Sequence, residues 1–488
     1  MLKTQLPYYP NVFAQYAMIA YVGALLIIPT INTSMIMSWY WWVFGIVSVF
    51  LFFHYSNQLT RDWSRMSPRL FEQRLFWMAF ILRIIAVIIL YNLFIWDHDS
   101  PFMFHAADSA GYHEVATDIL AWYQTRGLDA WWQFAQNEQG VSDLGYPSWL
   151  FFQYIFTGGN VFIARVIKSI LGAFTCVFVY RIAMRNFGES TGRMAGIFCM
   201  LMPNLIMYCG MHLKETEMIF VLMFFCERAD LMLRQDKLVV MNLVATVILI
   251  LLLFTFRTVL GAAALLALGV ALMLTNERVS RIGKRWILTI IVVMIGMYFV
   301  GGRIAMEMEQ YWEGREDNQR TRLEDRSKKG NVLARNASFI VFAPMIFTLP
   351  FPTMVETFNQ ETFRMLHGGV FVKNVMSGFT ILAFFFLVFV SDSSPTGRWQ
   401  IKFLRGEWRE HLLIEVMLVA YLGILAMSAF AHAERFHLVA VPLELIFVAY
   451  GVSRLHRRYY WYATAWTALM FVAAIAWNVF KLRGRGLA

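Results

Sequence analysis

Long apolar runs separated by short polar turns fill most of the chain, and this pattern sets the first expectation about its fold. A helix that crosses a bilayer needs about 20 largely apolar residues. The pattern therefore predicts an all-α, polytopic membrane helix bundle, and one integral membrane domain over residues 1–488. We expect about thirteen spans, near residues 12–31, 38–56, 76–96, 158–182, 192–209, 213–232, 238–256, 258–275, 286–302, 371–390, 412–430, 438–453 and 460–480.

Two longer polar segments interrupt this alternation. The first, residues 97–147, carries eight acidic side chains and one basic side chain, and its apolar and aromatic residues recur at helical spacing. That spacing predicts amphipathic helices lying on the membrane surface. The second segment, 303–370, opens with a densely charged stretch over 303–337 and continues into a Phe-, Ile- and Pro-rich stretch over 338–354. We expect the latter stretch to be re-entrant or interfacial, because it is short and interrupted by proline.

Composition agrees with a membrane protein. Of the 488 residues, 59% are hydrophobic and 15% are charged, against about 25% charged in soluble domains. The basic residues behind the net charge of +10 lie in short turns that fall on one side of the predicted spans, so the charge indicates topology and not a nucleic-acid partner. Basic turns are favoured on the cytoplasmic side of a membrane, and this bias places the N-terminus in the cytoplasm and both long polar segments outside. The basic tail at 481–485 disagrees with this topology, because it would lie outside if the last predicted span crossed the membrane. Either that segment does not cross the membrane, or the tail is an exception to the charge bias.

Several other kinds of chemistry are disfavoured. The sequence has no phosphate-binding Gly-Lys-Ser/Thr loop for a nucleotide and no Cys/His set with zinc spacing. The four cysteines lie in or beside apolar runs, so we expect buried thiols that act as small hydrophobic groups. The first apolar run lacks a small-residue cleavage site, and we expect it to be retained as an anchor.

A candidate catalytic group follows the third predicted span. Asp108 lies just beyond it, with His105 three residues earlier and Tyr112 four residues later. Residues four apart share one face of a helix, so Asp108 and Tyr112 are expected to lie together. The alternative is that Asp108 only caps a helix.

Other ionisable residues cluster at the external ends of predicted spans. Charges at membrane depth are costly, and they mark either function or a compensating pair. Arginine binds phosphate oxygens in a bidentate manner, so cations beside an acidic group fit a lipid phosphate held next to a base. Lys214 and Glu215 could instead simply lie among the headgroups. The candidates for contacts with a substrate are His105, Tyr112, Lys214, Glu215, Arg257, Glu434, Arg435 and His437.

Short motifs in one order resemble those of the C-type membrane glycosyltransferases, which use sugars linked to polyprenyl phosphate. The first-loop motif is Asp108-Ser109-Ala110-Gly111-Tyr112, followed by Gly145-Tyr146-Pro147. The resemblance covers about residues 76–456 and continues through Pro203-Asn204, His212-Leu213-Lys214-Glu215, Phe256-Arg257, Glu434-Arg435-Phe436-His437, Val441-Pro442 and Tyr450-Gly451.

The resemblance implies an inverting transfer in which Asp108 is the catalytic base. Asp108 would take a proton from the acceptor hydroxyl while Arg435, Lys214 and Arg257 hold the leaving lipid phosphate. His105 would orient Asp108 or contact a ligand. Some members bind a divalent cation, so the cofactor stays open. The resemblance also implies a bacterial inner membrane, a polyprenyl-phosphate sugar as donor, and an acceptor that is a glycan, a lipid or a protein.

Two alternatives stay open at this stage. A lipid-linked glycan ligase or polymerase would use a large external loop between late spans, and residues 303–337 would be that loop. The early position of the acidic motif argues against it. A transporter would place polar residues in broken helices near the middle of the membrane. The sequence shows few charges inside the predicted spans.

Overall fold

Helices form every regular element in the described part of the chain. The computed structural model describes residues 8–31, 36–103, 107–138, 140–235, 239–274, 306, 345–356, 361–389, 407–427, 433–455 and 457–483. The α-helices are α1 (Asn11–Ile31), α2 (Trp39–Asp62), α3 (Pro68–His98), α4 (Ala107–Arg126), α5 (Asp129–Asn137), α6 (Gly145–Thr157), α7 (Val161–Phe187), α8 (Glu189–Leu201), α9 (Pro203–Gly210), α10 (Glu215–Arg234), α11 (Val240–Phe256), α12 (Thr258–Leu274), α16 (Glu361–Phe389), α17 (Leu412–Met427), α18 (Glu434–His437), α19 (Val441–Arg454) and α20 (Tyr460–Arg483).

The long helices identify a membrane protein. Six helices in the described residues are long and apolar enough to cross a bilayer, namely α1, α2, α3, α7, α16 and α20, and the pair α8 and α9 makes up to seven. The expected count of about thirteen is not confirmed. Helices α11, α12 and α17 are apolar but shorter, α10 carries several charges, and the expected span at 286–302 lies outside the described residues.

One expected span is two helices. Helices α8 and α9 meet at an angle of 45° where the sequence predicted a single span over 192–209. Proline lacks the backbone N–H that would continue α8, and its fixed φ suits the first turn of a new helix. Pro203 is that first residue of α9. The break turns α9 toward the candidate site.

Helix α3 buries one stripe of its surface. In α3 the buried residues recur every three or four positions, as one face of a helix requires: Phe71, Leu75, Ala79, Arg83, Val87, Leu90 and Phe94. The opposite face exposes isoleucines at 81, 85, 88 and 89. A face of exposed isoleucines is stable in lipid, where no apolar surface meets water. The four cysteines are all buried and free, so the prediction of buried thiols is confirmed.

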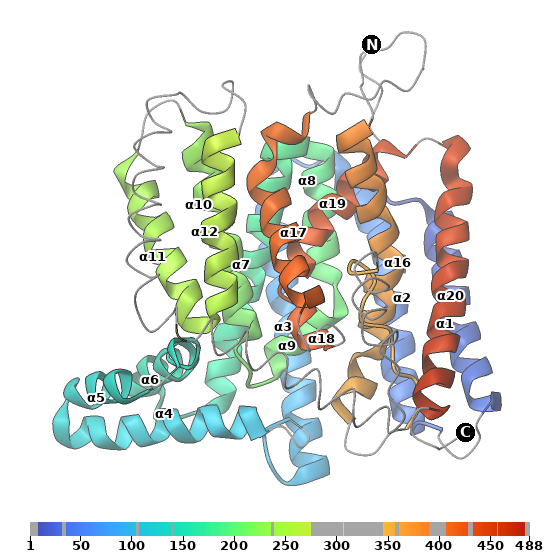
Figure 1. The fold of residues 1–488 in the computed structure, drawn as a ribbon. Coiled ribbons are helices and arrows are strands. Elements are labelled where there is room, and N and C mark those ends of the chain that lie inside the picture. Colours follow the sequence, from blue (N-terminus) through green and yellow to red (C-terminus); the bar gives the residue numbers. More distant parts are fainter. Residues whose placement is uncertain are drawn as a thin grey trace, which may run out of the picture.

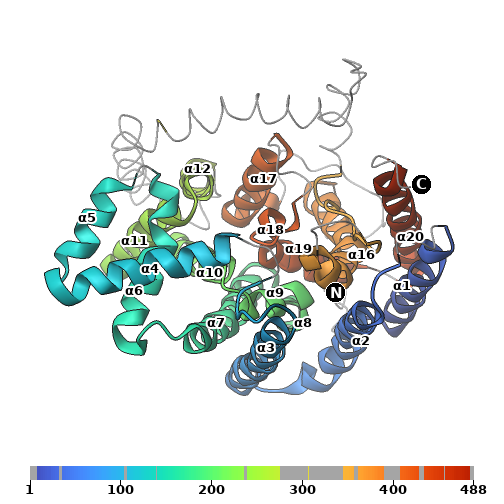
Figure 2. The ribbon, with the colours of Figure 1, turned by 90° about the horizontal axis from the view of Figure 1, so that it is seen from below.

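Helices α4, α5 and α6 lie across one end of the bundle, and we call this end the α4 end (Figure 1). Their exposed aromatic residues include Trp122, Trp132 and Phe156. Such rings are favoured at the interface between lipid and water. Viewed from this end, α1, α2 and α20 lie together on one side of the bundle and α5 and α11 on the other (Figure 2).

An irregular segment, residues 345–356, is held inside the bundle. The Nδ2 atom of Asn374 in α16 donates to the carbonyl of Pro350 at 2.9 Å. Asn478 in α20 donates to the carbonyl of Pro352 at 2.9 Å and accepts from the amide of Met354 at 2.7 Å. Backbone without helical hydrogen bonds is tolerated at membrane depth only where protein or water satisfies it. Residues 338–344, also part of the expected re-entrant stretch, lie outside the described residues.

Candidate functional site

Four separate parts of the chain meet at the α4 end (Figure 1). The bundle is antiparallel, so turns far apart in sequence return to the same end. His105 lies outside the described residues. The other candidates are Asp108 in the first turn of α4, Tyr112 one turn later, Lys214 and Glu215 at the start of α10, Arg257 between α11 and α12, and Glu434, Arg435 and His437 in α18.

Arg435 joins two of the candidate carboxylates. Its Nη1 donates to Oδ2 of Asp108 at 2.5 Å, and its Nε donates to Oε1 of Glu215. The Asp108 side chain is 54% exposed, whereas Glu215 is fully buried. Burial disfavours the charge of Arg435, but the charge of Glu215 and the hydrogen bond to Asp108 outweigh it and raise the pKa of the guanidinium. The result is a cation held between an inner and an outer carboxylate.

One carboxylate oxygen of Glu215 does not contact Arg435. Among the described residues, no group donates a hydrogen bond to its buried Oε2 atom. A buried carboxylate oxygen without a donor is destabilising, so this atom is a place where a ligand hydroxyl would bind favourably.

Lys214 and Tyr112 lie beside this pair. The Nζ atom of Lys214 is 3.6 Å from Oδ1 of Asp143 and donates to the carbonyl of Ser142 at 3.2 Å. It also lies 5.9 Å from the centre of the Tyr112 ring. Burial, followed by repulsion from Arg257, lowers the pKa of Lys214. Burial raises the pKa of Tyr112 to about 12, so its hydroxyl remains a hydrogen-bond donor at neutral pH.

Arg257 is a second guanidinium at the same end. Its Nη1 donates to the hydroxyl of Tyr421 at 3.0 Å, and its Cζ lies 4.2 Å from the ring centre of Phe436. Phe436 is the residue after Arg435. In the described part of the chain, no carboxylate forms a salt bridge with Arg257. Among the described residues, the Arg257 charge is therefore not neutralised by a carboxylate.

Glu434 and His437 turn away from Asp108 into the bundle. Successive residues of a helix are about 100° apart, so Glu434 and His437 share a face of α18 that Arg435 does not. Glu434 accepts hydrogen bonds from Asn204 and Tyr208 of α9, each at 2.7 Å. Burial raises the pKa of Glu434 to about 7. These contacts hold α18 in place.

His437 completes the anchoring of α18. It is fully buried, and its Nδ1 lies 3.5 Å from Nζ of Lys373 in α16. Lys373 also donates to the carbonyl of Leu349 and lies 3.8 Å from Oε1 of Glu444. Glu434 and His437 therefore position Arg435 from the inside of the bundle.

A chain of three side chains links α4, through α6, to the turn between α9 and α10. Nδ1 of His113 is 2.9 Å from the hydroxyl of Tyr154, which is 3.2 Å from Nε2 of His212. Burial lowers the pKa of both histidines, so both are neutral at pH 7. The sequence argument included His212 in a motif but gave none of these three residues a role. His113 lies five residues after Asp108, so this chain helps to fix the helix that carries the candidate base.

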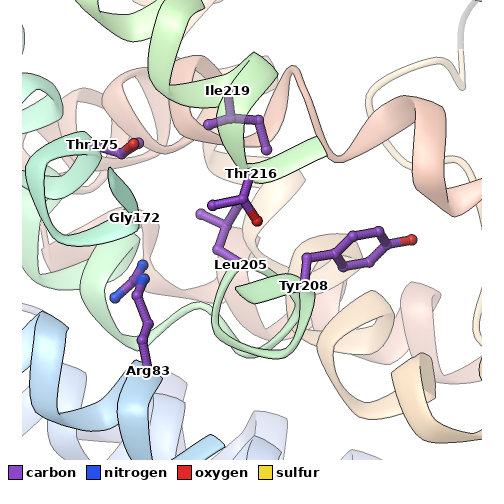
Figure 3. Close-up of a pocket in the computed structure, with 7 residues that line it drawn as sticks. All are labelled: Arg83, Gly172, Thr175, Leu205, Tyr208, Thr216 and Ile219. Atoms are coloured by element: carbon purple, nitrogen blue, oxygen red, sulfur yellow. The ribbon is translucent and has the colours of Figure 1, made fainter. Parts of the chain in front are cut away.

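Buried charges inside the helices were also missed. Arg83 points into a small cavity of about 10 Å³, which has room for about one water molecule. Its Nη1 donates to the carbonyl of Ala79 at 3.1 Å. A lysine or arginine inside an apolar run is the signal that would have found such residues. Figure 3 shows the lining, which is Arg83, Gly172, Thr175, Leu205, Tyr208, Thr216 and Ile219.

A larger apolar pocket lies between α6, α7, α10 and α11. Its volume is about 330 Å³. Phe256, which precedes Arg257, is part of its wall. The wall is made by Trp149, Leu171, Glu217, Phe220, Val221, Phe224, Ala245, Ile248, Leu249, Leu252 and Phe256.

No group of three or more His, Cys, Asp or Glu side chains that could hold a metal ion occurs within the described ranges. Comparisons of the chain with protein-family models, with curated proteins and with solved structures find no match.

Proposed function

We propose that this protein is a membrane glycosyltransferase that moves a sugar from a polyprenyl-phosphate donor to an acceptor, with inversion and with Asp108 as the general base. The observation that carries the proposal is the contact of Arg435 with both Asp108 and Glu215. This contact brings Asp108 of the first loop together with Arg435 of the late motif, which lies 327 residues further along the chain. We further propose that this end faces the outside of a bacterial inner membrane.

The cations suit a phosphate at the surface of the bilayer. Arg257 lies over the ring of Phe436, the residue after Arg435, and Lys214 lies over the ring of Tyr112. Guanidinium groups bind phosphate oxygens in pairs. The apolar pocket beside Phe256 offers a favourable environment for the hydrocarbon chain of the same lipid.

The reaction follows from these positions. The acceptor oxygen attacks the anomeric carbon, and a new C–O bond forms on the face opposite the phosphate. Asp108 takes the hydroxyl proton, and it is exposed enough to reach an acceptor. The bond between the anomeric carbon and the phosphate oxygen breaks, and the electron pair leaves with the lipid phosphate. The cations stabilise that developing charge, while Oε2 of Glu215 is placed to accept a hydroxyl of the sugar.

One observation favours a transporter as the second candidate. Lys168 and Glu217 form a fully buried ion pair with Nζ and Oε2 3.3 Å apart, and α8 and α9 form a bent pair. Transporters bind their substrates at buried polar groups beside broken helices. Such a protein would move its ligand without changing it chemically, so chemical turnover separates the two candidates.

The test is a turnover assay on the purified protein. The probe is a membrane lipid extract that contains polyprenyl-phosphate sugars, mixed with envelope material as acceptor. We expect the wild type to release free polyprenyl phosphate and Asp108→Asn to release none. Asp118→Asn removes the same charge from an exposed position of α4 and should retain activity. Near-normal turnover by Asp108→Asn would exclude Asp108 as the base.

A further inference from the structure

The turn between α9 and α10 is buried, although its residues belong to neither helix. It consists of residues 211–214, and Met211, His212 and Leu213 are at most 1% exposed. The carbonyl groups of such a turn need partners, because a buried carbonyl without one is costly. The turn leads directly into Glu215, the inner carboxylate of the site. Its conformation therefore sets where Lys214 and Glu215 lie.

Lys168 of α7 supplies those partners. Its Nζ donates to the carbonyl of Met211 at 3.0 Å and to the carbonyl of Leu213. It also donates to the hydroxyl of Tyr146 at 3.1 Å. Oε2 of Glu217 lies 3.3 Å away. The ammonium group is thus surrounded by oxygen atoms, two of which belong to the turn itself.

The opposite side of the turn is also held. The His212 side chain lies 3.2 Å from the hydroxyl of Tyr154 and packs with its ring centre 6.0 Å from that of Tyr146. Lys168 therefore fixes the alternate carbonyls, while His212 fixes the residue between them.

We propose that Lys168 is a positioning residue that holds the turn 211–214 so that Lys214 and Glu215 face the donor phosphate and Arg435. The inference rests on the proposed function. Lys168 acts through the backbone of the turn, and Glu217 balances its charge. The two residues thus contribute differently, although they form one ion pair.

Three variants separate the hydrogen bonds to the turn from the balance of charge. Lys168→Met removes the hydrogen bonds to the turn and leaves Glu217 unpaired. The double variant Lys168→Met/Glu217→Gln also removes the hydrogen bonds but leaves neither charge of this ion pair. Replacing a buried ion pair by neutral residues is often harmless to stability. Glu217→Gln alone keeps the hydrogen bonds from Lys168 to both carbonyls.

The experiment measures amide hydrogen exchange over residues 211–216 and the affinity for polyprenyl phosphate in the same preparations. In the double variant we expect exchange to be about tenfold faster, because charged hydrogen bonds to the turn are lost. We also expect an affinity about tenfold weaker, and a lower melting temperature because two buried carbonyl groups lose their donor. Glu217→Gln should show a much smaller effect on both. Arg193→Met/Glu189→Gln, which removes an ion pair beside the turn between α2 and α3, should leave exchange at 211–216 unchanged.

Two results would overturn the inference. One is unchanged exchange over 211–216 in the double variant. The other is a loss of affinity for polyprenyl phosphate that is equal in Glu217→Gln and in the double variant. Loss of charge balance alone would then explain the weaker binding. Failure of the proposed function can be distinguished from failure of this inference. If the proposed function is wrong, the wild type binds no polyprenyl phosphate, whatever the rate of amide exchange over residues 211–216.

Discussion

Asp108 and Arg435 form an ion pair, and this contact predicts an unusual variant. A donor phosphate must compete with Asp108 for Nη1 of Arg435. Asp108→Asn removes the competing charge, while Glu215 still holds Nε of Arg435. We therefore expect the variant that loses turnover to bind polyprenyl phosphate more tightly than the wild type.

The magnitude follows from the exposure of the pair. The Arg435 side chain is 24% exposed and that of Asp108 is 54% exposed, so solvent screens their attraction. Partly exposed ion pairs contribute about 0.5–1 kcal/mol, which corresponds to a gain in affinity of about two- to fivefold. The gain should shrink as salt concentration rises, because salt screens the same attraction.

The assay is a titration of detergent-solubilised protein with polyprenyl phosphate at low and high salt. Asp118→Asn is the matched control, since it removes one exposed carboxylate from the same helix. An affinity for Asp108→Asn equal to or weaker than that of the wild type, at low salt, would refute the competition between Asp108 and the phosphate.

Three further variants test other parts of the structure. Arg257→Gln should weaken binding of polyprenyl phosphate roughly tenfold, the value of one charged hydrogen bond, and an unchanged titration would exclude this contact. Glu434 has its pKa raised to about 7, so the folded state holds a proton that the unfolded state releases above about pH 4.5. The free energy of unfolding of the wild type should therefore fall by roughly 3 kcal/mol between about pH 4.5 and 7. Thermal unfolding of Glu434→Gln should not show this fall. If stability changes with pH in the same way in both proteins, the protonation of Glu434 is not the cause. Gly451→Ala would place a Cβ 2.2 Å from the carbonyl oxygen of Phe379, while Gly423→Ala has open space. Gly451→Ala should lower stability by about 1–3 kcal/mol and the control should not, so equal melting temperatures would contradict the packing of α16 on α19.

The sequence predicted the helical class because hydropathy depends on residues close together in the chain. It could not predict how many helices span, because that depends on tertiary contacts. Glu227 and Asp230 in α10, for example, pair with Arg185 in α7 at 3.0 and 2.8 Å. Their charges are compensated by a helix that the hydropathy of α10 does not reveal.

The site was predictable as a set of residue types but not as a geometry. Motif order suggested that Asp108 and Arg435 belong together, and the structure places them in contact. The inward direction of Glu434 and His437 depends on the short helix α18, which the motif alone does not specify. Lys168 was missed because one lysine hardly changes the hydropathy of an apolar run. Its partners are backbone carbonyls 43 and 45 residues away.

The central claim is that Arg435 holds a polyprenyl phosphate beside Asp108, and mass spectrometry of retained lipids tests it most directly. Wild-type protein, Arg435→Ala and Arg126→Ala would be purified in the same detergent and incubated with polyprenyl phosphate. Arg126 is the matched control, an exposed arginine at the end of α4. The account predicts that the wild type and Arg126→Ala retain the lipid, with or without a sugar, and that Arg435→Ala is depleted of it. No retention by the wild type, or equal retention by Arg435→Ala, would contradict the account.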